Sequence, residues 1–109
     1  MPSEAEEQAM VVQYCLLKKY KFWHTPNSTY TKSWKQKAHN RAMGVQAGIP
    51  DLFIIVDGNL IAVEMKRQKG GVVSPAQKEW IETLNNIGIS AKVCKGAEEA
   101  IAFINSMVK

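Results

Sequence analysis

The chain has 109 residues, of which 46% are hydrophobic and 22% are charged, and its formal net charge is +4. This composition is that of a folded globular protein, and the length predicts a single domain over residues 1–109 with a modest core. The apolar runs are too short to cross a bilayer, so we expect a cytoplasmic, intracellular protein that does not bind membranes. The two cysteines, Cys15 and Cys94, lie in apolar stretches without the spacing of zinc ligands, and we expect reduced core thiols.

The first predicted element is a helix that begins after Ser3 and runs to about Tyr20. Ser3 and Glu6 have the spacing of a capping box, in which each side chain accepts a hydrogen bond from the other residue's backbone N–H group. Helical periodicity predicts one buried stripe on this helix. Its expected members are Met10, Tyr14 and Leu17.

A short strand and a long basic segment follow. Phe22 to Thr25 can form the strand, which Pro26 ends. Residues 27–48 are polar, basic and poorly periodic, so we expect a long basic loop with at most one short helix.

The charge of this region is unevenly placed. Between residues 18 and 41 the chain carries seven lysines and arginines and no acid. Such a segment favours a polyanionic partner, and the alternative is a solvated surface that keeps the protein soluble. Trp34 and Tyr30 would stack on unpaired bases or pack beneath the loop. His24 and His39 are expected to be structural or to contact phosphate.

The middle of the chain predicts two strands joined by a tight turn. Leu52 to Val56 is an apolar run typical of a strand that is buried on both faces. Asp57-Gly58 is a strong signal for a two-residue hairpin turn. The return strand is expected from Asn59 to Lys66.

A helix, a strand and a final helix are predicted after a glycine-bearing loop. Ser74-Pro75 has the residues of a helix N-cap and first position, and Gly88 ends that helix. The strand is expected from Ala91 to Cys94 and the last helix from Ala97 to Val108. The expected apolar faces of the two helices are Trp80, Ile81, Leu84 and Ile87, and Ala100, Ile101, Ile104 and Met107. The succession of elements predicts an α/β fold.

The hairpin register predicts a cluster of polar residues. With a two-residue turn, Val56 lies opposite Asn59, so Asp51 falls opposite Glu64. Alternation along a strand puts Lys66 on the same face as Glu64. Two carboxylates and an amine therefore converge at one end of the sheet.

Two carboxylates this close repel each other unless a cation lies between them. Oxygen ligands with open water positions suit Mg²⁺ or Mn²⁺, which can activate water and stabilise charge on a phosphate oxygen. The alternative is an exposed acid pair with Lys66 as its salt-bridge partner. Leu60 and Ala62 share the face, and acids at the end of a largely apolar sheet favour the metal site.

Three motifs carry a resemblance to a known family. Pro50-Asp51, then Glu64 and Lys66, form the pattern P-D-x12-E-x-K, which resembles the PD-(D/E)xK nuclease signature. Residues 44–51 and 74–80 are similar to the G-v-x-x-G-x-P-D and S-P-x-Q-x-x-W motifs of the VRR-NUC family. Residues 24–27 resemble a segment of its single-domain, phage-type members. The likeness runs from about Glu4 to Ile104 in the same order.

This resemblance implies a restriction-endonuclease-like core: a mixed sheet flanked by helices, in α-β-β-β-α-β order, plus a C-terminal helix. It implies that Asp51, Glu64 and the backbone carbonyl of Met65 bind Mg²⁺ or Mn²⁺. Lys66 would orient the attacking water or stabilise the transition state.

Two helices would complete the catalytic site of such a nuclease. The family pattern places a glutamate two residues before a glutamine on the first helix, which indicates Glu6, while helical phase also admits Glu7. Gln77 would project from a later helix toward the metal or the scissile phosphate. The helix N-terminus at Ser74 could attract a phosphate. Candidate contacts to nucleic acid are Asn27, Lys32, Lys35, Lys37, Arg41, Lys69 and Ser74.

The implied function is that of a metal-dependent endonuclease that hydrolyses DNA. We expect it to select its substrate by the shape of the DNA and not by its sequence. The resemblance further implies a homodimer acting on branched DNA such as four-way (Holliday) junctions. One alternative is a non-catalytic nucleic-acid-binding module or subunit of a larger nuclease. Another is a nuclease that acts on RNA or single-stranded DNA.

Overall fold

The protein is built from four helices and four strands in the part of the chain that its computed structural model describes, residues 1–25, 33–44 and 46–109. The elements are α1 (Glu4–Lys18), β1 (Lys21–His24), α2 (Trp34–Ala42), β2 (Leu52–Val56), β3 (Asn59–Lys66), α3 (Pro75–Asn86), β4 (Ser90–Lys95) and α4 (Ala97–Ser106). This order confirms the predicted α/β fold, with α2 as the short helix of the basic segment.

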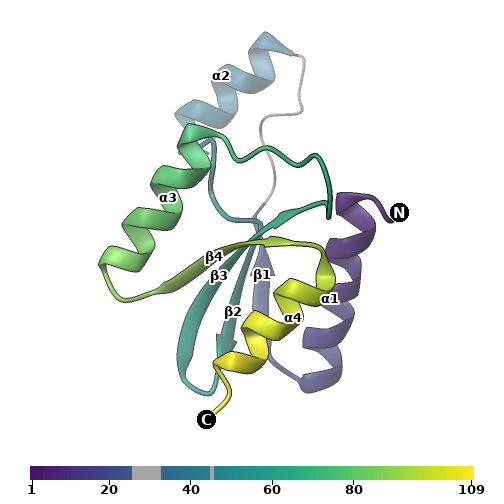
Figure 1. Cartoon of the computed structure of the whole chain (residues 1–109). Helices are drawn as coiled ribbons and strands as arrows, with labels where there is room; N and C mark the ends of the chain where they lie inside the picture. The colour runs from purple at the N-terminus through teal and green to yellow at the C-terminus, as the bar shows by residue number, and fades with distance from the viewer. Residues whose placement is uncertain (26–32, 45) are drawn as a thin grey trace.

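The four strands form one mixed sheet in the order β1-β2-β3-β4 (Figure 1). The pairs β1–β2 and β2–β3 are antiparallel, and β3–β4 is parallel. The antiparallel hairpin needs only the turn at Asp57 and Gly58, whose φ angles of 48° and 84° match the twist of the strands. The parallel pair requires a crossover, which α3 supplies.

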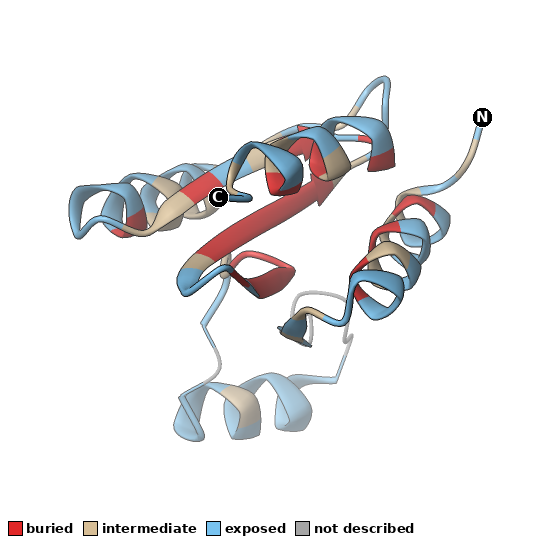
Figure 2. Ribbon diagram, turned by 90° about the horizontal axis from the view of Figure 1, so that it is seen from below, coloured by how far each residue is buried: buried red, intermediate tan, exposed pale blue. Residues whose placement is uncertain are grey.

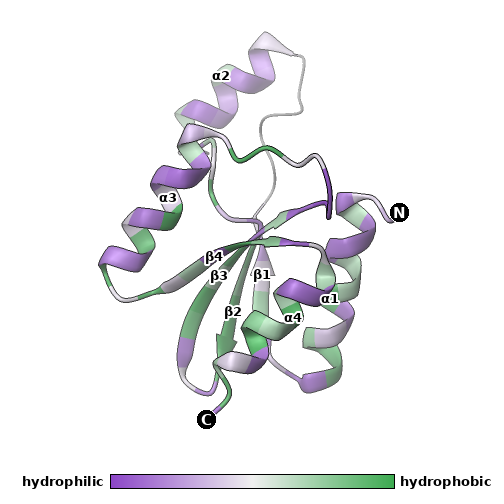
Figure 3. Ribbon diagram, viewed as in Figure 1, coloured by the Kyte–Doolittle hydropathy of each residue, from purple (hydrophilic) through white to green (hydrophobic). Residues whose placement is uncertain are grey.

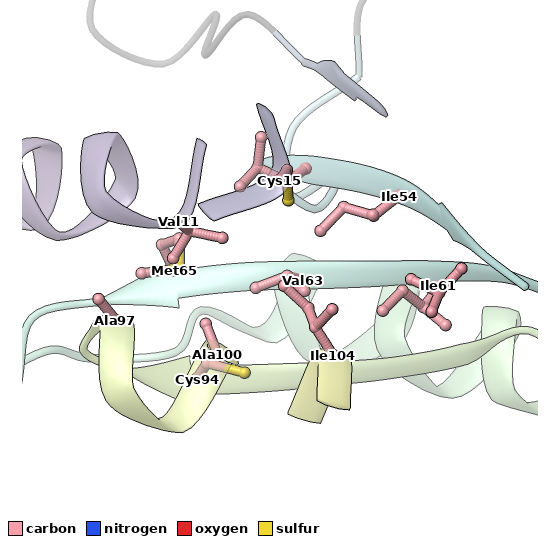
Figure 4. Close-up of a cluster of buried hydrophobic side chains, with 12 residues drawn as sticks. Val11, Cys15, Ile54, Ile61, Val63, Met65, Cys94, Ala97, Ala100 and Ile104 are labelled. Atoms are coloured by element: carbon pink, nitrogen blue, oxygen red, sulfur yellow. The ribbon is translucent and has the colours of Figure 1, made fainter. Parts of the chain in front are cut away.

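Helices cover both faces of the sheet. Helices α1 and α4 pack on one face, where Val11 and Cys15 of α1 and Ile104 of α4 meet Ile54 and Val63 of the strands (Figure 4). Helix α3 packs on the other face, mainly through Leu84, Trp80 and Ile81. The buried residues gather along the sheet and the inner sides of these helices (Figure 2).

The buried stripe of α1 differs from the predicted one. Met10 is 47% exposed and Leu17 is 78% exposed, while the buried residues are Glu7, Val11 and Cys15. Tyr14, the third expected member, is partly buried against the core, so the predicted stripe was wrong at two of its three positions and its phase was wrong by about one residue. The stripe that is buried begins with the carboxylate of Glu7. By sequence alone, the series of Met10, Tyr14 and Leu17 therefore looked more apolar.

The two cysteines have the state that the sequence predicted. Cys15 and Cys94 are buried free thiols, and burial raises the pKa of each to about 11, so both stay protonated at neutral pH.

The predicted burial of two other elements is corrected at single residues. Strand β2 is buried except at Ile55, which is 41% exposed. Ile87 is 68% exposed because α3 ends before it, and its assignment to the apolar face was wrong.

Helix α2 lies outside the layers of the sheet, beyond the first turn of α3 (Figure 1). It has no buried residue, and its surface is hydrophilic (Figure 3). Trp34 at its start is 83% exposed, and the ammonium group of Lys37 lies 5.8 Å from the centre of the Trp34 ring. Among the described residues, no helix is long and apolar enough to cross a membrane.

Candidate metal centre

The predicted hairpin register is confirmed. Leu52 pairs with Val63 and Val56 pairs with Asn59, so Asp51, which directly precedes β2, lies opposite Glu64. Both side chains belong to the face of the sheet on which α3 packs, because they alternate with residues that face α1 and α4. Strand pairing alone thus brings the two acids together.

A third carboxylate joins this pair from the first helix. One carboxylate oxygen each of Glu4, Asp51 and Glu64 lies within 4.8 Å of the others. Glu64 is only 2% exposed and Asp51 only 8% exposed, while Glu4 is partly buried. The first turn of α1, which carries Glu4, lies beside the end of β3 (Figure 1).

The structure therefore brings Glu4 to the cluster, and not Glu6 or Glu7. Glu6 is exposed, and its carboxylate accepts a hydrogen bond from Ser3 N in the predicted capping box. Glu7 points into the core and binds elsewhere. The missed signal was the phase of the helix, because positions 4, 7, 11 and 15 follow one helical face.

Burial and mutual repulsion hold a proton at this cluster. Burial, a hydrogen bond with Asp51 and the charge of Asp51 together raise the pKa of Glu64 from 4.5 to about 9, while Lys66 lowers it. Burial also raises the pKa of Glu4, which Lys66 again opposes. Without a cation, the site therefore holds a proton at neutral pH.

Asp51 is held by its surroundings on both sides. Its Oδ2 accepts a hydrogen bond from Met65 N at 2.8 Å, and its backbone carbonyl accepts one from Thr25 N at 2.8 Å. His24 Nδ1 lies 3.1 Å from the same carbonyl and 3.1 Å from the amide nitrogen of Gln8. His24 thus makes structural contacts, which is one of the two roles expected for it, and a contact with phosphate stays a prediction.

Lys66 ends β3 on the same face as Glu64. It is half-buried, and its charge lowers the pKa of both Glu64 and Glu4. Its positive charge therefore acts on both carboxyl groups, and the cluster is three acids under the influence of one cationic side chain.

The first turn of α3 approaches the segment that leads into Asp51. A Cβ atom on Gly48 would lie 2.6 Å from the carbonyl carbon of Ala76, and the φ of Gly48 is +88°, so a side chain is excluded there. Ser74 and Gln77 form a reciprocal capping box at this turn: Gln77 Oε1 accepts from Ser74 N at 2.9 Å. The amide oxygen of Gln77 thus serves the helix end, and its predicted contact with metal or phosphate stays a prediction.

The predicted nucleic-acid contacts that the structure describes come from α2, from the loop after β3 and from the start of α3. Lys35, Lys37 and Arg41 are exposed on α2, and Lys69 is exposed in the loop after β3. Asn27, Lys32 and Tyr30 lie outside the described residues.

The donor set of the cluster fits a divalent cation. It consists of carboxylate oxygens, which Mg²⁺ and Mn²⁺ prefer, in a space small enough for one ion to contact all three. Glu4, Asp51 and Glu64 would hold the ion. The contribution of the Met65 carbonyl stays a prediction.

A mixed sheet between helices, with buried carboxylates meeting at neighbouring strand ends, defines an α/β domain with a candidate metal centre. The family model of the VRR-NUC domain matches residues 3–98. A solved structure of a VRR-NUC domain protein superposes with a TM-score of 0.78 and 30% sequence identity, covering 95% of this chain and 86% of that chain. The chain belongs to the VRR-NUC family. No curated protein matches it significantly.

Proposed function

We propose that this protein is a metal-dependent endonuclease that hydrolyses DNA phosphodiester bonds at the cluster of Glu4, Asp51 and Glu64. The observation that carries the proposal is this buried cluster, in which three carboxylate oxygens lie within 4.8 Å of one another. Such a concentration of acids is costly in a core unless a cation compensates it. Membership of the VRR-NUC family, which is of nuclease type, also supports a nuclease.

The residues of the cluster have separable tasks in this proposal. A bound Mg²⁺ or Mn²⁺ would supply an activated water and stabilise charge on the phosphate oxygens. Glu64, whose pKa is raised to about 9, would have to lose its proton to solvent in order to serve as a ligand. Asp51 is already oriented by the Met65 N–H group. The ammonium group of Lys66 positions the attacking water or the phosphate from the same face.

The basic surface of α2 is the proposed contact with the DNA backbone. Lys35, Lys37 and Arg41 are exposed there, and α2 contains no acidic residue. Contacts of this kind bind phosphates without reading bases. The proposed selection is therefore by DNA shape, with branched DNA such as a four-way junction as the substrate and a homodimer as the active form.

The deciding experiment compares binding with cleavage. The purified protein is incubated with linear, flapped and four-way-junction DNA, and with single-stranded DNA and RNA, in Mg²⁺, Mn²⁺ or EDTA. We expect cleavage in metal, none in EDTA, and none with Asp51→Asn. Glu79→Gln, which removes an exposed acid on α3, is the matched control and should cleave like the wild type. Binding without cleavage in either metal would refute the enzyme and leave a nucleic-acid-binding module, and RNA in the panel tests the remaining alternative.

A further inference from the structure

A third buried carboxylate, besides Asp51 and Glu64, belongs to Glu7 and lies outside the metal centre. Glu7 is 2% exposed. Its Oε1 accepts a hydrogen bond from Gln68 Nε2 at 2.7 Å, and its Oε2 accepts one from Ala97 N. We call Glu7, Gln68, Gly96 and Ala97 the Glu7 junction, because they join α1, the loop after β3 and the start of α4.

Gly96 makes room for this junction. Its φ is +89°, and a Cβ atom there would lie 2.8 Å from Gln68 Cγ and 3.1 Å from Glu7 Oε2. As the N-cap of α4, Gly96 has no side chain that could accept from the first helical N–H groups. Glu7 of α1 provides that acceptor instead, and its negative charge suits a helix N-terminus.

The junction is connected to the metal centre in two ways, through helix α1 and through the backbone at the end of β3. Glu7 lies three residues after Glu4 on α1, which is about one helical turn, so the position of Glu7 sets the position of the turn that carries Glu4. On the other side, Gly96 N donates to the backbone carbonyl of Lys66 at 2.8 Å. Gln68 follows Lys66 by two residues and is itself bound to Glu7.

We propose that Glu7 is a positioning residue that holds Glu4 against the carboxylates of Asp51 and Glu64. This inference rests on the proposed function, since it concerns the same metal centre. Packing alone does not call for an acid at position 7, because an apolar side chain would fill the space. Such a side chain would leave the N–H groups of Gln68 and Ala97 without their acceptor, and the first turn of α1 would lose its hydrogen bonds to the loop after β3 and to α4.

The test compares metal affinity with stability. Affinity for Mg²⁺ and Mn²⁺ is measured by calorimetry without DNA, and the free energy of unfolding by urea in EDTA. Glu7→Gln turns an amide N–H₂ group toward one of the two donors and so breaks one hydrogen bond. We expect metal affinity to fall about tenfold, as for other residues that orient metal ligands.

Tyr14→Phe is the matched control. The Tyr14 hydroxyl donates to Asn105 Oδ1 and so also joins α1 to α4, but at the other end of α1. We expect this variant to lose stability and to keep the metal affinity of the wild type.

Two double variants identify the route of the effect. In Glu7→Gln with Gln68→Glu, the new amide can donate to the new carboxylate while its oxygen accepts from Ala97, so most of the metal affinity should return. In a Glu4→Ala background, adding Glu7→Gln should change metal affinity no further, because the residue that Glu7 positions is already gone. Gln68→Ala removes one hydrogen bond from an exposed side chain and gives a smaller loss in the same direction, which keeps the test decisive if Glu7→Gln does not fold.

Wild-type metal affinity in Glu7→Gln or Gln68→Ala overturns the inference, and so does an equal loss of affinity in Tyr14→Phe. A wild-type protein that binds neither metal overturns the proposed function instead. The two failures are therefore distinguishable.

Discussion

Replacing Glu64 by glutamine is expected to stabilise the protein in the absence of metal. Glu64 is 2% exposed, and its pKa rises from 4.5 to about 9 through burial and its contact with Asp51. Between these two values the folded protein binds a proton that the unfolded chain does not bind. Its stability therefore falls as the pH rises through this range, by about 1.4 kcal/mol for each pH unit.

The effect is large enough to measure at neutral pH. From pH 4.5 to pH 7 the loss sums to on the order of 3 kcal/mol, which is on the order of 10 °C in Tm for a domain of this size. Glu64→Gln keeps the size of the side chain and a donor toward Asp51 but cannot ionise, so it avoids this loss. The variant should also lose metal binding, because its neutral amide is a poor substitute for a carboxylate ligand.

The assay is urea or thermal unfolding in EDTA, followed by circular dichroism from pH 5 to pH 9. The two proteins should be nearly equally stable at pH 5 and should diverge as the pH rises, with the variant more stable. Glu79→Gln changes an exposed acid and should follow the wild type. Parallel curves for wild type and Glu64→Gln over the whole range would show that Glu64 does not hold a proton in the fold.

Three further predictions concern chemistry, DNA and assembly. Lys66→Ala should retain metal and DNA binding and lose most cleavage. Lys95 is the exposed residue that pairs with Lys66 on β4, and Lys95→Ala should cleave normally. An active Lys66→Ala protein would mean that Lys66 is only a salt-bridge partner. Neutralising Lys35, Lys37 and Arg41 together should weaken DNA binding and flatten its salt dependence, by roughly 0.9 in log–log slope for each phosphate that the variant no longer binds; an unchanged slope would mean that these charges only keep α2 solvated. Light scattering at low micromolar concentration should give the mass of a dimer, and a monomer that cuts both strands of a junction at once would contradict the proposed assembly.

Much of the fold and one part of the site could be predicted from local sequence. A two-residue turn at Asp57-Gly58 leaves one possible register for the hairpin, so the facing of Asp51 and Glu64 follows from counting residues. The capping boxes that begin α1 and α3 also depend on residues three apart. In these cases the interacting groups are neighbours in the chain, and their spacing alone determines the geometry.

The identity of the third acid was decided only by the tertiary structure. Two series of residues on α1 had helical spacing, and the one that is buried contains Glu7, which no local rule would bury. Glu7 is buried because its partners arrive from far along the chain: Gln68 is 61 residues away and Ala97 is 90 residues away. That phase in turn brings Glu4, and not Glu6, to the metal centre. Helical periodicity defines the possible faces of a helix, but the face that turns inward depends on hydrogen-bond partners and packing surfaces that exist only once the sheet and α4 are assembled.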